Sequence, residues 1–320
     1  MGIMSLPMPA AVPVASEEER VDPARCQACG GTLRVRFAAV RDPQTREAFS
    51  ILECTRCGLG HTAPRPKDLA SYYRGYHGGR HGKTADYCAR RRVRILRQVA
   101  DSSACRLLDI GCGDGSFLLA ARAAGWTVVG TEMNTGPARQ LGLEVYPHIS
   151  DVQSHAPFDA ISLWHTFEHL PDPRATLGEI RGLLSSNGVL IIAVPNAGGL
   201  QARAFRAKWF HLDVPRHLYH FTRSSLANLL QSEGFIPFRE WHQEFEYDLL
   251  GWSQSALNLA PGPPNLFFDL LRGFKPPIGK LPSVLAWLSG ALLTALAIFL
   301  VPVGTLTRRG GTLIIAARRA

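Results

Sequence analysis

The chain has 320 residues, of which 46% are hydrophobic and 19% are charged. This composition is that of a folded protein and excludes a wholly disordered, collagen-like or coiled-coil chain. The formal net charge of +9 favours contact with phosphates or anionic membrane surfaces but does not choose between them. The seven cysteines are an odd number, which fits a reducing cytosol better than a disulfide framework.

Four of the cysteines are grouped near the amino terminus. They form two CxxC pairs, each followed directly by a glycine, at Cys26, Cys29, Cys54 and Cys57. Two residues between thiolates let one tight turn present both sulfurs to a tetrahedral ion, and the glycine permits a close backbone approach. The spacing predicts a structural zinc site in a ribbon over residues 21–66. Residues 1–20, which precede the ribbon, are expected to be a disordered leader. A redox dithiol and an iron–sulfur cluster are the alternatives.

From residue 106 onward, apolar runs alternate with helical patterns. The expected strands are 106–110, 127–131, 158–163, 189–194, 235–245 and 311–317, and the expected helices are 87–100, 116–124, 174–184 and 224–233. This alternation predicts a mostly parallel, doubly wound α/β fold over residues 67–320. In such a fold, ligands bind beyond the carboxyl ends of the strands.

The first of these strands ends in a glycine-rich turn. Residues 108–116 read Leu-Asp-Ile-Gly-Cys-Gly-Asp-Gly-Ser, so the backbone of this turn can approach a ligand closely. A dinucleotide fingerprint would need glycine at position 116, where the chain has Ser116. Glu132 ends the second strand, where its carboxylate can accept hydrogen bonds from two ribose hydroxyls. An NAD site is therefore the alternative interpretation of this turn.

These motifs, with segments 158–159 and 186–190, resemble those of the class I S-adenosylmethionine-dependent methyltransferases, in particular the methyltransferase-23-like subgroup. The resemblance implies a Rossmann-like sheet of seven strands and S-adenosylmethionine as the cofactor. It also implies that the glycine loop faces the methionine part of the cofactor and that the acid after the second strand binds ribose. The implied cofactor-binding residues are Asp109, Gly111, Cys112, Gly113, Gly115, Glu132, Met133 and His165. The family's acidic residue that contacts adenine has no clear counterpart here.

A histidine-rich segment follows the fourth strand, at the edge where reactants meet in an open parallel sheet. His165 is the first candidate in it for contact with cofactor or substrate, because a base helps methyl transfer when the acceptor is a hydroxyl. The pair Glu168-His169 resembles a motif of small-molecule O-methyltransferases, including those of ubiquinone synthesis. Its alternative role is to brace the next helix.

Residues 209–222 are too polar and aromatic to be simple connecting chain, and they resemble a signature of bacterial methyltransferases encoded with polysaccharide or lipid pathways. Loops at this place cover the acceptor pocket in that family. Asp213, Arg216 and His217 are candidates to bind or deprotonate the acceptor, so the predicted catalytic set is His165, His217 and Asp213. The structural alternative is that Arg216 only pairs with Asp213.

An apolar insertion separates the last two strands, at about residues 247–307, and segment 281–307 carries no charged side chain. It is long enough to span a bilayer, but a single crossing would place the final strand on the wrong side of its sheet. We therefore expect it to return as a hairpin broken near Gly290 or Pro302, to lie in the membrane interface, or to pack on protein. Basic residues flank the run and favour anionic lipid, while a homodimer interface is the alternative.

Together these features predict a cytoplasmic enzyme on the membrane surface. Its predicted reaction is methyl transfer from S-adenosylmethionine to a small-molecule, glycan or lipid-linked acceptor, at oxygen. The competing predictions are an NAD-dependent oxidoreductase and a non-enzymatic zinc-ribbon protein that binds nucleic acid through its basic residues. Nucleic acid is not favoured as a partner, because no recognised base-reading helix or aromatic binding motif accompanies the positive charge.

Overall fold

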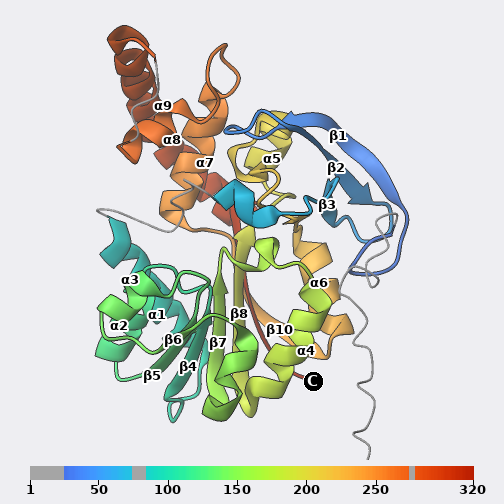
Figure 1. The fold of residues 1–320 in the computed structure, drawn as a ribbon, viewed down its shortest axis with the longest axis vertical. Helices are drawn as coiled ribbons and strands as arrows, with labels where there is room; N and C mark the ends of the chain where they lie inside the picture. The colour runs from blue at the N-terminus through green and yellow to red at the C-terminus, as the bar shows by residue number, and fades with distance from the viewer. Residues whose placement is uncertain (1–24, 74–83, 274–277) are drawn as a thin grey trace, which may run out of the picture.

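The computed structural model describes residues 25–73, 84–273 and 278–320, so the predicted leader over 1–20 lies outside the described residues. Two β-sheets organise this part of the chain (Figure 1). The larger has seven strands in the order β6-β5-β4-β7-β8-β11-β10, which confirms the predicted doubly wound fold. Its strands are β4 (Arg106–Ile110), β5 (Thr127–Thr131), β6 (Val145–Tyr146), β7 (Phe158–Trp164), β8 (Leu184–Pro195), β10 (Phe235–Trp241) and β11 (Thr312–Arg319).

The five strands from β6 to β8 are parallel, whereas β11 runs antiparallel to both β8 and β10. The carboxyl ends of the parallel strands therefore gather at one edge of the sheet. The helices are α1 (Ala85–Val99), α2 (Ser116–Ala123), α3 (Gly136–Gln140), α4 (Pro173–Leu183), α5 (Leu200–Phe205), α6 (Arg223–Ser232), α7 (Phe245–Leu257), α8 (Leu266–Leu271) and α9 (Lys280–Leu306).

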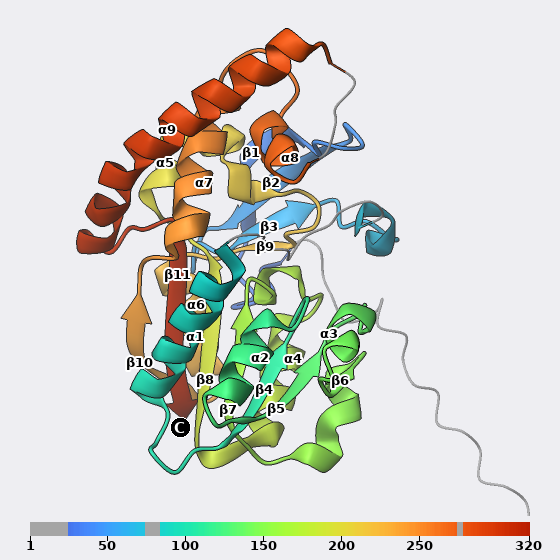
Figure 2. The same ribbon diagram turned by 90° about the vertical axis from the view of Figure 1, so that its left-hand side faces the viewer.

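Both faces of this sheet are buried, which explains the continuous apolar runs of its central strands. In β8, Val189 and Ile191 pack with α1, α2 and α3, while Leu190 and Ile192 pack with α4 and α6. Successive side chains of a strand point to opposite faces, so each apolar run supplies two cores at once. Figure 2 shows α1 and α2 lying over the face of the sheet that is turned to the viewer.

The smaller sheet has four strands in the order β1-β2-β3-β9. The ribbon contributes β1 (Leu33–Arg41), β2 (Ala48–Cys54) and β3 (Gly60–Ala63), but β9 (Tyr219–His220) belongs to the predicted acceptor segment. Its apolar side chains Phe49 and Ile51 pack against Trp209 and Leu212 of that segment. The ribbon is thus joined to the methyltransferase-like part by a shared sheet and a shared core.

The apolar insertion is a helical arm at the upper end of the molecule (Figure 1). The strand expected over 235–245 is shorter in the structure and ends at Trp241. Phe245, the last residue of the expected strand, is the first residue of α7. The break expected near Gly290 or Pro302 is also absent, because α9 runs through both as one helix of 27 residues. A side chain at Gly290 would collide with the ring of Phe267 in α8, so this glycine serves helix packing rather than a turn.

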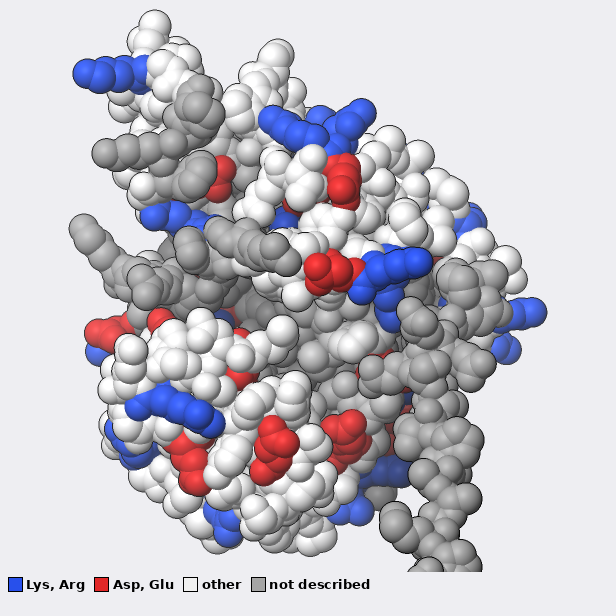
Figure 3. Space-filling view, in the orientation of Figure 1, with Lys and Arg blue, Asp and Glu red and all other residues white. Residues whose placement is uncertain are grey.

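Helix α9 lies obliquely across α7 and α8, and its last turn leads back into β11 (Figure 2). Among the described residues it is the one helix long and apolar enough to cross a membrane, by length and composition, and only 17% of its most apolar window is buried. The space-filling view shows Lys and Arg side chains standing among uncharged atoms at this end of the molecule (Figure 3). We call its exposed apolar side chains the α9 face: Leu281, Val284, Leu285, Trp287, Leu288, Leu292, Leu296, Ile298, Phe299, Leu300, Val303 and Leu306.

Candidate active site

The glycine-rich turn after β4 forms a cradle at the carboxyl edge of the sheet. Gly111, Gly113 and Gly115 all have positive φ, at 73°, 57° and 82°, a region that favours glycine. A Cβ at Gly111 would collide with Thr166, and one at Gly115 would collide with Leu143. A Cβ at Gly113 would meet no atom of the described chain within 4 Å, so open space lies in front of this residue.

The carboxylate of Glu132 fastens the next strand to this cradle. It accepts hydrogen bonds from the backbone N–H of Gly113 (3.1 Å) and of Asn134 (3.4 Å). Because the side chain is only partly buried, it retains lone pairs for a ligand. Its neighbour Met133 is 79% exposed, so its side chain is free to cover a bound molecule.

Two other residues predicted to bind the cofactor are buried under the cradle. Asp109 accepts a hydrogen bond from Ser162 Oγ (2.6 Å), and burial raises its pKa to about 7 despite that bond. Cys112 is buried as well, with its Sγ directed toward Gly130. Only the backbone of Cys112 is therefore suited to line the open space, and Asp109 supports the loop from below.

His165 directly follows β7 and lies between two carboxylates. Its Nε2 is 2.5 Å from Glu244, its Nδ1 is 3.7 Å from Glu168, and its ring stacks on Tyr247 at a centroid distance of 4.0 Å. Burial would lower the pKa of His165, but the charges of Glu244 and Glu168 raise it to about 9. An imidazolium ion at neutral pH stabilises negative charge, and it is not suited to accept a proton.

Asp213 and Arg216 form an ion pair, which is the structural alternative to a role in binding or deprotonating the acceptor. Arg216 donates to Asp213 Oδ1 through Nη2 (2.6 Å) and Nε (3.0 Å), and Nη2 also donates to the fully buried Asp42 (2.9 Å). Burial would raise the pKa of Asp213, yet the guanidinium of Arg216 lowers it to about 2. This geometry favours a role for Asp213 in holding the loop over a role as a base.

His217 has a different environment from His165, although both are buried. Its Nδ1 is 2.9 Å from the carbonyl oxygen of His211, and its Nε2 lies 3.9 Å from both Glu168 and Asp213. Burial, and after it the charge of His169, lowers the pKa of His217 to about 4. His217 is therefore neutral at pH 7.

Glu168, His169 and His217 form a compact group that we call the acceptor cluster. One carboxylate oxygen of Glu168 and one ring nitrogen of each histidine lie within 4.8 Å of one another. Glu168 and His169 belong to a 3-10 turn, Phe167–His169, which directly follows the β7 edge. Since Thr166 of the same segment touches Gly111, the acceptor cluster adjoins the glycine cradle.

Two residues that the sequence did not single out complete the site. Glu244, fully buried before α7, pairs with Arg91, Arg92 and His165. Tyr73, at the end of a 3-10 turn after the ribbon, places its hydroxyl 2.9 Å from His169 Nδ1. No local pattern marks either residue, because each reaches the site from an element that is distant along the chain.

Comparison with known proteins supports the same chemistry. A family model described as a methyltransferase domain matches residues 80–237, which include the glycine cradle, Glu132 and the acceptor cluster. The ubiquinone biosynthesis O-methyltransferase of Dinoroseobacter shibae is 27% identical over 172 residues, covering 48% of this chain and 69% of that protein. The chain belongs to the class I S-adenosylmethionine-dependent methyltransferases. This excludes the competing NAD-dependent oxidoreductase.

Other relatives of this methyltransferase match a shorter part of the chain or match it at lower sequence identity. The ubiquinone biosynthesis O-methyltransferase of Actinobacillus pleuropneumoniae is 32% identical over 107 residues, which cover 28% of this chain and about half (46%) of that protein. A solved S-adenosylmethionine-dependent methyltransferase from Archaeoglobus fulgidus aligns with a TM-score of 0.47 at 17% identity, covering 79% of this chain and all of that one.

The four ribbon cysteines of the methyltransferase converge as predicted. Cys26 and Cys57 place their sulfurs 3.5 Å apart, as do Cys29 and Cys54, and all four sulfurs lie within 4.8 Å of one another. The backbone N–H groups of Arg56 and Cys57 point to Cys54 Sγ, at 3.4 and 3.5 Å. Four soft sulfur donors with this convergence fit a closed tetrahedral zinc site.

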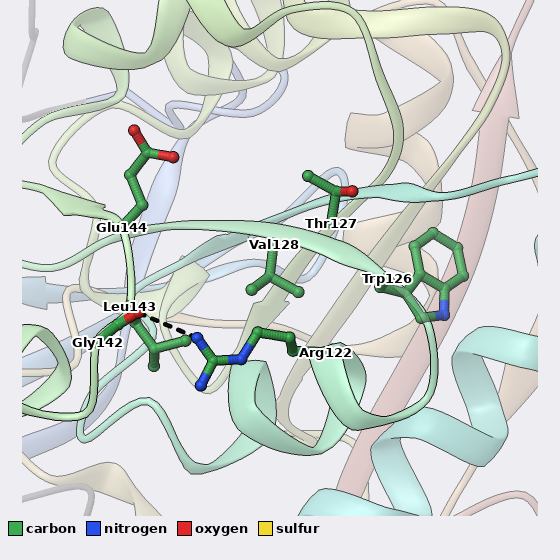
Figure 4. Close-up of a pocket in the computed structure, with 7 residues that line it drawn as sticks. All are labelled: Arg122, Trp126, Thr127, Val128, Gly142, Leu143 and Glu144. Carbon is green, nitrogen blue, oxygen red and sulfur yellow. Dashed lines mark hydrogen bonds between the residues drawn. The ribbon is translucent and has the colours of Figure 1, made fainter.

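A separate pocket lies away from this chemistry (Figure 4). It is lined by Arg122, Trp126, Thr127, Val128, Gly142, Leu143 and Glu144. Arg122 bridges it by donating to the carbonyl oxygen of Gly142 (3.0 Å). Because β5 begins at Thr127, this pocket lies at the amino end of the strand, opposite the edge that carries the glycine cradle.

Proposed function

We propose that this methyltransferase moves the methyl group of S-adenosylmethionine to an oxygen atom of a small-molecule, glycan or lipid-linked acceptor. The observation that carries the proposal is that the glycine cradle, bound to Glu132, adjoins a buried acid and histidine cluster at one sheet edge. The relatives named as O-methyltransferases favour oxygen as the accepting atom. Their names, which refer to ubiquinone biosynthesis, also support an acceptor of the lipid class.

On the cofactor side, we assign Glu132 to the ribose hydroxyls and the backbone of Gly111–Gly115 to the methionine part. The open space in front of Gly113 and the free lone pairs of Glu132 fit such a molecule. When bound, S-adenosylmethionine supplies a methyl group on a positively charged sulfur, ready for in-line displacement. The chain's own task is to hold the acceptor oxygen in line with that methyl group.

On the acceptor side, the hydroxyl must lose its proton during the transfer. Of the three predicted catalytic residues, His165 is a cation and Asp213 is paired with Arg216. We therefore assign activation of the hydroxyl to the acceptor cluster around His217, and we assign His165 and Asp213 to positioning it. Tyr73 adjoins the cluster from the segment that follows the ribbon.

The α9 face supports a place for the enzyme on the cytoplasmic surface of a membrane. Twelve large apolar side chains are exposed on one helix, with Arg272 and Lys280 near its beginning. A patch of this kind in a single chain marks an interaction surface. We propose that it lies on lipid without crossing the bilayer, because β11 must rejoin the sheet that carries the cofactor site. A homodimer through the same face is the alternative.

The test is methyl transfer with the purified full-length chain. Radiolabelled S-adenosylmethionine is incubated with lipid extracts and, separately, with soluble extracts of bacterial cells. Label should appear in the lipid fraction, and NMR of product made with ¹³C-methyl S-adenosylmethionine should show the methyl carbon bonded to oxygen. Label confined to water-soluble compounds would remove the lipid part of the proposal, and methylation at nitrogen or carbon would overturn the oxygen assignment.

A further inference from the structure

The acceptor cluster has a feature that simple hydrogen bonding leaves unexplained. The side chain of Glu168 is 1% exposed, and neither of its carboxylate oxygens has a hydrogen-bond partner among the residues that the structure describes. Leaving a buried carboxylate without donors is costly, so such groups are normally paired or bound to a cation. The nearest ring nitrogens are His165 Nδ1 at 3.7 Å and His217 Nε2 at 3.9 Å, both beyond hydrogen-bond range.

His169 Nδ1 contacts both the carbonyl oxygen of Arg216 (3.0 Å) and the hydroxyl of Tyr73 (2.9 Å). His217 is held in one tautomer, because its Nδ1 lies 2.9 Å from the carbonyl oxygen of His211. A carbonyl oxygen only accepts, so Nδ1 of His217 carries the hydrogen and donates it. In the neutral ring of His217, Nε2 then carries the lone pair. A backbone carbonyl that fixes the remote nitrogen is the usual outer support of a metal-binding histidine.

We propose that Glu168, His169 and His217 form a second metal site, distinct from the four cysteines, for a divalent first-row transition ion. Two imidazoles and one carboxylate suit zinc, iron(II) or manganese(II) better than magnesium or calcium, which prefer oxygen ligands alone. Three protein ligands leave coordination positions open for an acceptor. The charge of His165 does not oppose the ion strongly, because Glu244 balances it from the other side.

The role of this ion rests on the proposed methyl transfer to oxygen. An acceptor hydroxyl bound to the ion has a lowered pKa and releases its proton to water. Its oxygen lone pair then forms the new carbon–oxygen bond while the methyl–sulfur bond breaks. The sulfonium becomes a neutral thioether, and the ion keeps its oxidation state throughout. The site therefore supplies the activation of the acceptor hydroxyl.

Cobalt(II) titration of the metal-free full-length chain tests the site without any activity assay. Cobalt bound by four thiolates shows strong sulfur-to-metal charge transfer, whereas cobalt bound by nitrogen and oxygen shows only weak ligand-field absorption. We expect two equivalents to bind, one with each signature. Glu168→Gln should keep the charge-transfer signal and weaken the second equivalent by at least about 100-fold, since it removes a direct ligand.

A matched pair of histidine variants guards against a folding artefact. His169→Ala removes a half-buried ligand, and His155→Ala removes a half-buried histidine outside the cluster. His169→Ala should lose the second equivalent of cobalt. His155→Ala should bind cobalt like the unchanged chain, and both variants should show the native circular dichroism. A single equivalent in the unchanged chain, or a second one that survives both Glu168→Gln and His169→Ala, would overturn the site. Two equivalents without methyl transfer would instead count only against the proposed function.

Discussion

Glu132 shows how one side chain can shape a site and bind in it. It directly follows β5, and by accepting from the Gly113 N–H it holds the glycine turn in its left-handed geometry. The neighbouring carboxylate Asp109 has the opposite character, because it is buried and its pKa is raised. Two acids on neighbouring strands thus have different roles, since Glu132 faces the ligand space and Asp109 supports the glycine turn from below.

At the residue scale, we predict that Glu132→Gln weakens binding of S-adenosylmethionine. The change removes a charged acceptor from the ribose hydroxyls, which should cost about 1–3 kcal/mol. Isothermal titration calorimetry measures the loss directly. Glu144→Gln is the control, because Glu144 lines the separate pocket and its carboxylate accepts from the Tyr146 hydroxyl (2.8 Å). Unchanged affinity in Glu132→Gln would contradict the ribose assignment.

A second residue-scale prediction concerns Asp248 in α7. Burial raises the pKa of this carboxyl from 3.8 to about 8. Between these two values the folded state holds a proton that the unfolded state has lost, so stability must fall as pH rises. Relative to Asp248→Asn, the unchanged chain should lose about 1.4 kcal/mol per pH unit in this window. Urea unfolding from pH 5 to 8 measures it, and parallel pH profiles for the two chains would refute the raised pKa.

At the scale of elements, the ribbon acts as a brace for the acceptor segment. Its strand β3 pairs with β9, and Thr62 donates to the carbonyl oxygen of His217 (2.6 Å). Arg174 of α4 donates to the carbonyl oxygen of Ala28, next to the cysteine site (2.8 Å). A metal that fixes the ribbon therefore also fixes the backbone that presents His217.

We predict that zinc removal harms acceptor turnover more than cofactor binding. Cys54→Ser should loosen β3 and β9 and lower kcat/KM on the order of 10–100-fold through misplaced acceptor groups. Affinity for S-adenosylmethionine should stay nearly constant, since the cradle lies on β4 and β5. Elemental analysis and calorimetry follow the two effects, and Cys105→Ser, at an exposed cysteine, is the control. An equal loss of both properties would mean that the ribbon supports the whole fold.

At the scale of the whole molecule, the apolar arm and the catalytic edge are connected. Helix α7 begins beside Glu244, which binds His165, and α9 packs along α7. The last turn of α9 returns to the sheet, where Leu200 N–H donates to the Arg309 carbonyl oxygen (2.8 Å). Whatever the α9 face binds is thus held at a fixed place relative to the site.

We predict that Leu285→Ser, Leu288→Ser and Leu292→Ser together abolish binding to anionic lipid vesicles. Each burial of a leucine side chain is worth about 1.5–3 kcal/mol, so the triple change should reduce partitioning by at least about 100-fold. Vesicle sedimentation measures this. Ile236→Ser with Phe238→Ser, on the exposed edge strand β10, should leave sedimentation unchanged. Absence of binding in the unchanged chain, together with dimers that the triple variant splits, would assign the α9 face to self-association.

Local chemistry along the chain determined the parts that need only short-range information. CxxC spacing predicted the cysteine site, and the glycine turn with Glu132 predicted the cofactor cradle, because each set lies on one turn or two adjacent strands. Tertiary structure decided the rest. Only folding shows that Arg216 reaches Asp42, that Glu244 confines His165, and that β9 completes the ribbon sheet. These contacts join residues more than 70 positions apart, and a pKa or a free coordination position depends on such neighbours in space, which no local pattern contains.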